Sequence, residues 1–289
     1  MSDDAFEPAA RALSSQGLTL NYLDWGNEGA PWLFLVHGNG DHARSWDWTA
    51  RALRHDFHVV ALDLRGHGDS QWSPDGAYST AYHLLDLINL IEALKAEDVT
   101  IVAHSFGGAL GVRYAALYPE RVRKLAIVDG LGPAPHYAAQ WLKDGMLNRT
   151  RVWIDKRRDL AQRPLKRFNS IEEAAARLQK DNKRLPDAFA RHLALYGVRR
   201  DGEAYVWKRD PLVSAFTPED FLLENDETRA QVAAPVLLFY GPESWTTHPD
   251  EDGRARCLRD HRTIVFEETG HWLHHDRFED FIAELKAFL

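Results

Sequence analysis

The sequence is poor in cysteine, has no long hydrophobic run and carries no excess of basic residues. A single cysteine among 289 residues, Cys257, excludes an internal disulfide, so we expect a cytoplasmic protein. The formal net charge of −8 argues against a nucleic-acid partner, since nucleic-acid binders normally present a basic face. No apolar run approaches the roughly 20 residues that span a bilayer, so we expect no membrane association.

The N-terminal residues are acidic, with neither a basic region nor an apolar core, so the sequence predicts no secretory signal. A length of 289 residues with 45% hydrophobic residues suits one large domain or a domain with an insertion. Cys257 lies in a basic stretch that does not resemble the setting of a thiol nucleophile. We therefore expect an ordinary globular protein whose chemistry does not depend on cysteine.

Apolar strands alternate with amphipathic helices in the first half of the chain. Such alternation indicates a mostly parallel sheet with helices on both faces, which is an α/β fold. In the helix predicted at 81–94, Asp86 and Glu92 are expected to face water. Strands are predicted at 18–25, 32–36, 57–62, 99–103 and 122–128, and helices at 46–53, 81–94 and 109–117.

The pattern changes near residue 133 and resumes near residue 227. The intervening segment has almost no strand-like runs, and its clearest elements are amphipathic helices at 171–180 and 186–196. The sequence therefore predicts a core domain of residues 1–132 and 227–289 and a helical cap of residues 133–226. We expect the cap to lie over the carboxyl edge of the sheet, where open parallel sheets bind their ligands. Beyond the cap the sequence predicts strands at 235–240 and 263–266 and helices near 250–258 and at 277–289.

A basic segment lies within the predicted cap. Residues 143–167 contain nine Lys or Arg and three Asp residues. Such a segment is either a solvated helix face or a surface that attracts an anionic substrate towards the mouth of a cleft.

The most informative residues are 101–108, Ile-Val-Ala-His-Ser-Phe-Gly-Gly. An apolar strand runs directly into Ser105, and a helical pattern follows at once. A sharp turn from strand to helix strains the serine and exposes its hydroxyl, and its neighbours two residues away must be small, as Ala103 and Gly107 are. The pattern predicts a nucleophile; the alternative is a serine that caps the helix.

A serine nucleophile needs a base, and the base needs an acid to orient it. His271 follows the last predicted strand and should reach the same edge of the sheet as Ser105; His275 and a helix-capping role for His271 are the alternatives. For the acid, Asp129 directly follows the strand 122–128. Glu243, in the loop after the strand 235–240, and Asp250 remain alternatives, as does a turn-forming role for Asp129.

Acyl transfer also needs donors for the developing oxyanion. The turn His37-Gly-Asn-Gly40 follows the strand 32–36 and can present the backbone N–H of Asn39. Phe106 begins a helix directly after Ser105, where its N–H and the helix dipole favour negative charge. We therefore expect Asn39 and Phe106 to form an oxyanion hole, unless Gly38 and Gly40 are simply loop glycines.

Taken together, these motifs resemble the α/β-hydrolase fold family with a helical lid. The matching features occur in the family's order: His37-Gly-Asn-Gly, Asp63-Leu-Arg-Gly-His-Gly-Asp-Ser70, the turn at Ser105 and Gly270-His271-Trp. The common pattern has an aspartate three residues after Gly241, where this chain has Ser244. Some members resembling this arrangement carry the acid after the strand that follows the nucleophile's helix, which supports Asp129.

The serine nucleophile points to hydrolysis of small-molecule esters through an acyl-enzyme, without a metal or organic cofactor. Alternatives are a carbon–carbon bond or lactone hydrolase of the same fold, and a ligand-binding protein with a weak triad. The sequence leaves the acyl chain, the alcohol and the oligomeric state open. Candidate walls of the substrate pocket are Trp46, Trp141, Trp153, Trp207 and Trp245.

Overall fold

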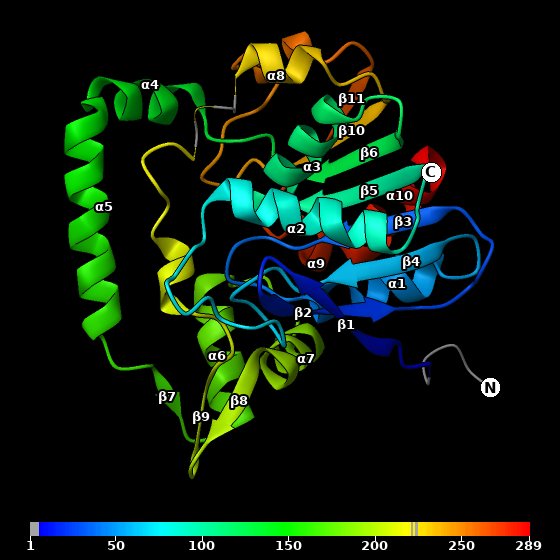
Figure 1. Cartoon of the computed structure of the whole chain (residues 1–289). Helices are drawn as coiled ribbons and strands as arrows, with labels where there is room; N and C mark the ends of the chain where they lie inside the picture. Colours follow the sequence, from blue (N-terminus) through cyan, green and yellow to red (C-terminus); the bar gives the residue numbers. More distant parts are fainter. Residues whose placement is uncertain (1–5, 221, 223–224) are drawn as a thin grey trace.

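The computed structural model describes residues 6–220, 222 and 225–289. Residues 1–5, part of the acidic segment that predicts no secretory signal, lie outside the described residues. An eight-stranded sheet forms the centre of the molecule, in the order β1-β2-β4-β3-β5-β6-β10-β11 (Figure 1). The strands are β1 Ala9–Ser15, β2 Leu18–Asp24, β3 Trp32–Val36, β4 His58–Leu62, β5 Val99–His104, β6 Val122–Val128, β10 Val236–Tyr240 and β11 His261–Val265.

The sheet is parallel from β4 to β11, and β1 and β2 add an antiparallel edge. Every residue of β4, β5 and β10 is buried, as the continuous apolar runs predict. The predicted α/β class with a mostly parallel sheet is confirmed. The sequence pattern does not predict β1, because its mostly exposed Ala, Arg and Ser residues carry little apolar alternation.

Helices cover both faces of the sheet, each over its own apolar core. On one face lie α2 (Thr80–Ala93), α3 (Phe106–Leu117) and α8 (Asp226–Ala230); on the other lie α1 (Asp47–Leu53), α9 (Leu273–Asp276) and α10 (Phe278–Phe288) (Figure 1). No helix in the described part of the chain is long and apolar enough to cross a membrane.

Two predictions about the core domain are wrong. Asp86 does not face water: it is fully buried and accepts a hydrogen bond from Arg65 Nε at 2.6 Å. The helix expected near 250–258 is only the short 3-10 helix Arg254–Cys257, because Gly253 before it adopts a left-handed conformation with φ 82°.

The chain between β6 and α8 forms a separate group of elements beside the sheet edge (Figure 1). The two amphipathic helices predicted there are confirmed as α6 and α7. The expectation of almost no strands is wrong, since β7, β9 and β8 form a three-stranded antiparallel sheet. These strands have two to four residues, too few for a periodic pattern. The elements are α4 Pro135–Lys143, α5 Gly145–Gln162, β7 Arg167–Phe168, α6 Ile171–Asp181, α7 Asp187–Gly197, β8 Val198–Asp201, β9 Ala204–Trp207 and the 3-10 helix Pro211–Ser214.

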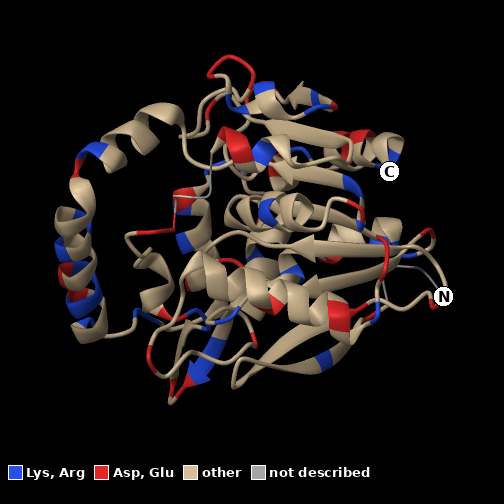
Figure 2. Cartoon of the chain, turned by 45° about the horizontal axis from the view of Figure 1, so that its top comes forward, with Lys and Arg blue, Asp and Glu red and all other residues tan. Residues whose placement is uncertain are grey.

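The basic segment 143–167 lies mostly on α5, which stands apart from the sheet, with basic and acidic side chains along its length (Figure 2). No residue of α5 is buried. Two of its arginines have structural contacts: Arg157 donates to the carbonyl oxygen of Gly76 at 2.8 Å, and Arg149 lies 3.8 Å from the ring centre of Trp141. The segment is therefore mainly a solvated helix face.

Candidate active site

Ser105 forms the turn between β5 and α3, with φ 52° and ψ −119°. This conformation is strained for a residue with a side chain. The turn requires small neighbours: a Cβ on Gly107 would collide with the carbonyl oxygen of Val36, and one on Gly130 would lie 2.5 Å from the carbonyl oxygen of Ser105. The Ser105 side chain makes no capping hydrogen bond to α3. The geometry therefore matches the nucleophile turn rather than a helix cap.

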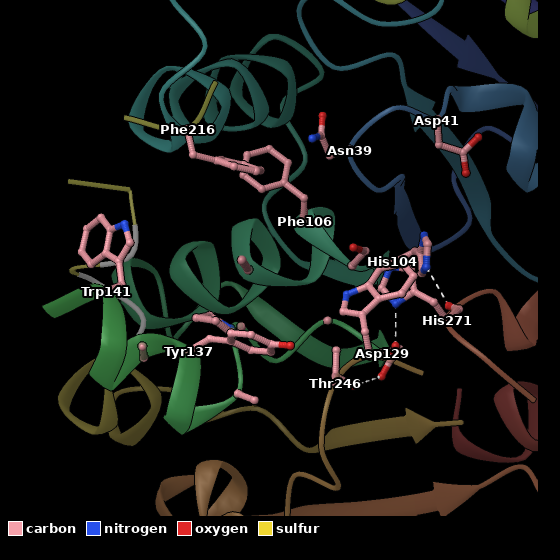
Figure 3. Close-up of a pocket in the computed structure, with 18 of the residues that line it drawn as sticks. Asn39, Asp41, His104, Phe106, Asp129, Tyr137, Trp141, Phe216, Thr246 and His271 are labelled. Atoms are coloured by element: carbon pink, nitrogen blue, oxygen red, sulfur yellow. Dashed lines mark hydrogen bonds and ion pairs between the residues drawn. The ribbon is translucent and has the colours of Figure 1, made fainter. Parts of the chain in front are cut away.

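His271 lies in the loop after β11, and its side chain is only 5% exposed. Its Nδ1 donates to Oδ2 of Asp129 at 2.5 Å (Figure 3). His104, the last residue of β5, donates from Nε2 to the carbonyl oxygen of His271 at 2.9 Å and so ties this loop to the serine turn. Ser105, Asp129 and His271 line one cavity.

Asp129 directly follows β6, and two hydroxyl groups hold its carboxylate. Ser244 Oγ donates to Oδ2 at 2.5 Å, and Thr246 Oγ1 donates to Oδ1 at 2.6 Å. Both hydroxyls come from the loop after β10, and Ser244 occupies the place where the common pattern has an aspartate. The sequence alone does not identify these two partners, although hydroxyl side chains at 244, 246 and 247 follow a buried strand.

The two alternative acids face other partners. Glu243 forms an ion pair with Arg184 at 2.5 Å, and its side chain is 49% exposed. Asp250 accepts a hydrogen bond from His261 Nε2 at 2.8 Å. Among the described residues, Asp129 is therefore the carboxylate that contacts His271.

The turn at residues 37–40 packs directly against the serine turn. A Cβ on Gly38 would lie 3.0 Å from Cβ of Ser105. Asn39 and Phe106 both line the cavity. In the described part of the chain, the backbone hydrogen bonds between turns and loops do not use the N–H of either residue. Phe106 is the first residue of α3, so its N–H has no partner within the helix. Two N–H groups are thus available beside Ser105.

Two buried histidines hold this turn in place. His37 donates from Nδ1 to the carbonyl oxygen of Gly38 at 2.7 Å, and its Nε2 accepts a backbone N–H at 3.0 Å. His67 accepts the N–H of Gly40 at 2.9 Å. Burial lowers the pKa of both histidines, which keeps their acceptor nitrogens unprotonated. The motif Asp63–Ser70 therefore contributes to the site through His67.

The cavity has a volume of about 600 Å³, and its wall is largely apolar. Trp141 and Tyr137 from α4 and Phe216 line it (Figure 3). Trp245, from the loop after β10, lines it as well. The ring centre of Trp245 lies 3.9 Å from that of His271. The wall is suited to an apolar group next to the serine.

The prediction that Trp46 lines the pocket is wrong. It is fully buried in the core on the face of the sheet that α1 covers, because the turn into α1 directs it there. Its ring centre lies 5.0 Å from that of His274. Trp153 lies on α5 beside Arg157 and is absent from this cavity wall. Trp207 lines a neighbouring cavity.

Among the residues that the structure describes, no three His, Cys, Asp or Glu side chains are grouped so that they could hold a metal ion.

Comparison with known proteins identifies the family and the fold. A family model described as alpha/beta hydrolase fold matches residues 31–278. A serine hydrolase-like protein of Danio rerio is 31% identical over 191 residues, which are 64% of this chain and 57% of the relative. The sn-1-specific diacylglycerol lipase ABHD11 of Mus musculus is 26% identical over 280 residues, which are 94% of this chain and 85% of the relative.

Solved structures share the architecture. The thioesterase domain from the curacin biosynthetic pathway superposes with a TM-score of 0.80 at 21% identity, covering 97% of this chain and all of that domain. E-2-(acetamidomethylene)succinate hydrolase gives a TM-score of 0.79 at 20% identity, covering 97% and 98%. At these identities the likeness supports the fold and leaves the substrate open.

Proposed function

Since the chain belongs to the α/β-hydrolase fold family, we propose that it is a serine hydrolase that cleaves carboxylic esters of small molecules. The observation that carries the proposal is the 2.5 Å contact between His271 and Asp129 on a cavity that Ser105 also lines. The names of the relatives support hydrolase chemistry, and the ester substrate is our inference from the serine.

In the proposed acylation step, Ser105 Oγ attacks the ester carbonyl while Nε2 of His271 takes the hydroxyl proton. Nδ1 of His271 already donates to Asp129, so Nε2 carries the lone pair that a base needs. The carboxylate of Asp129 then stabilises the imidazolium. Ser244 and Thr246 keep that carboxylate in place through both of its oxygens.

The proposed oxyanion hole consists of the N–H groups of Asn39 and Phe106. They flank Ser105, and the dipole of α3 adds positive potential at Phe106. When the tetrahedral intermediate collapses, the imidazolium of His271 protonates the leaving alcohol. Water then attacks the acyl-enzyme with His271 again acting as the base, which releases the acid and regenerates the serine.

The cap, residues 133–226 in our division, supplies much of the cavity wall. Trp141 and Tyr137 on α4 face the serine from the cap side, and Trp245 faces it from the core side. We therefore propose that the cap selects the acyl or alcohol group. We also propose a cytoplasmic location, on the basis of the single cysteine.

The test is the initial rate on short and long p-nitrophenyl esters, with wild type beside Ser105→Ala. We expect turnover by the wild type that the substitution abolishes. Turnover that survives the substitution would refute the role of Ser105. A strong preference for diketone substrates would indicate carbon–carbon bond hydrolysis, and tight ligand binding without turnover would indicate a binding protein.

A further inference from the structure

A second cavity, of about 250 Å³, lies beside the first between the core domain and the cap. Asn39, Asp41 and Trp272 line both cavities, so the two spaces meet at the proposed oxyanion turn. The two cavities are therefore neighbours that share part of their walls.

Arg209 reaches this second cavity from the segment after β9. Its guanidinium packs on the oxyanion turn, because a Cβ on Gly40 would collide with Arg209 Nη1. Gly40 has φ 84° and lies two residues from Gly38, which itself touches Ser105. A positive charge thus lies next to the turn that holds the proposed oxyanion donor.

Two buried arginines of this protein have carboxylate partners. Arg65 is paired with Asp86, and Arg254 with Asp252. Within the described part of the chain, by contrast, the guanidinium of Arg209 forms no hydrogen bond and no ion pair. Arg209 is exposed and lines the cavity, and the surrounding protein still desolvates the guanidinium enough to lower its pKa. An accessible but unpaired guanidinium in this setting favours an anionic ligand.

The carboxylates of the cavity, Asp41 and Asp181, compensate this positive charge only in part. Arg177 and Lys166 also line it, together with the carboxylates of Asp41 and Asp181. Asp181 is ion-paired with Arg177, and Asp41 accepts a neighbouring backbone N–H at 2.9 Å. The cavity therefore has three cationic and two anionic side chains, and Arg209 is the cation next to the first cavity.

We propose that the second cavity binds an anionic group of the substrate, a carboxylate or a phosphate, with Arg209 as its principal partner. This inference rests on the proposed function and specifies its substrate class: an ester with an acidic group some distance from the scissile carbonyl. A planar guanidinium donates two parallel N–H groups, which match the oxygens of either anion.

The test uses p-nitrophenyl esters that differ only in the end of the acyl chain. Chains of two to six methylenes end in a methyl group, a carboxylate or a phosphonate. We expect kcat/KM to be about 10- to 100-fold higher for an anionic ester than for its methyl counterpart at the best length, the range of one charge-assisted hydrogen-bonded pair. The comparison of carboxylate with phosphonate identifies the preferred anion.

Arg209→Gln should reduce that ratio to near one, whereas Arg200→Gln should leave it unchanged. Arg200 is an exposed arginine of β8 outside the cavity, so it controls for the loss of one positive charge. If the wild type shows no anionic preference at any length, or if Arg209→Gln leaves the preference intact, the anion site is refuted while ester hydrolysis stands.

A binding measurement separates this inference from the proposed function. Calorimetry with adipate on Ser105→Ala, with and without Arg209→Gln, reports the anion site without catalysis. If adipate binding depends on Arg209 and the wild type hydrolyses no ester, the anion site stands and the proposed hydrolase function is refuted. Adipate binding that is absent, or that Arg209→Gln leaves unchanged, would also refute the anion site.

Discussion

Asp129→Asn should separate the proposed triad acid from its alternatives. Two opposite charges 2.5 Å apart, as at His271 and Asp129, interact by about 7 kcal/mol at an effective dielectric constant of about 20. Both side chains are at most 5% exposed, so water screens this interaction little. The neutral amide retains part of the stabilisation. We therefore expect the imidazolium in the transition state to lose about 4–5 kcal/mol, which lowers kcat by about 10³- to 10⁴-fold.

The assay is kcat on the best p-nitrophenyl ester, measured for Asp129→Asn and for Glu243→Gln. Glu243→Gln breaks only a half-exposed ion pair with Arg184, and exposed pairs contribute little, so kcat should change by less than about 2-fold. Circular dichroism and thermal unfolding of both variants should resemble the wild type, because the amide replaces the carboxylate at nearly the same size.

A larger loss in Glu243→Gln than in Asp129→Asn would refute the reasoning and move the acid to the loop after β10. A loss below about 10-fold in Asp129→Asn, in a folded protein, would mean that the contact with His271 does not carry the catalytic charge.

The remaining predictions concern the support of the site and its stability. Gly130→Ala should lower kcat by at least about 10-fold, measured on the same ester, because the new Cβ would press on the backbone of Ser105. Thr246→Val should lower kcat while KM stays nearly constant, because it removes one hydroxyl donor to the carboxylate that orients the proposed base. Equal changes in kcat and KM would contradict this role. Asp86→Ala should lower the free energy of unfolding in urea by about 3–5 kcal/mol, because it leaves the buried guanidinium of Arg65 unpaired. The free energy of unfolding should also fall as pH drops from 7.5 to 5.5. Burial lowers the pKa of several histidines in the folded state, so the unfolded chain takes up protons near its ordinary pKa of 6.5 that the folded chain does not. Each such histidine contributes up to about 1.4 kcal/mol per pH unit, and a flat profile in urea titrations would refute this. These histidines are His37, His67, His83, His104, His274 and His275.

Much of the fold follows from local patterns. The strand at 99–103 is a continuous apolar run, the helix at 171–180 has amphipathic spacing, and Ser105 lies between small residues at a strand-to-helix turn. Each of these features depends on neighbours in the chain, so the sequence is sufficient to predict it. The strands of the cap were missed because runs of two to four residues carry no period.

Side chains whose partners are distant in sequence could not be placed in the same way. From the sequence alone, Asp86 is expected at the surface and Trp46 in the wall of the pocket, but the fold buries both. The buried position of Asp86 depends on Arg65, 21 residues away. Sequence spacing alone does not reveal which charges meet.

By itself, the sequence determined the α/β sheet, the strained turn at Ser105 and the position of His271 after the last strand, because backbone sterics and apolar periodicity act locally. Only the tertiary structure decided which carboxylate meets His271, since β6 and β10 lie side by side and both end near that ring. It also brought Arg209 onto the turn of residues 37–40, a contact across more than half of the chain that no local pattern encodes.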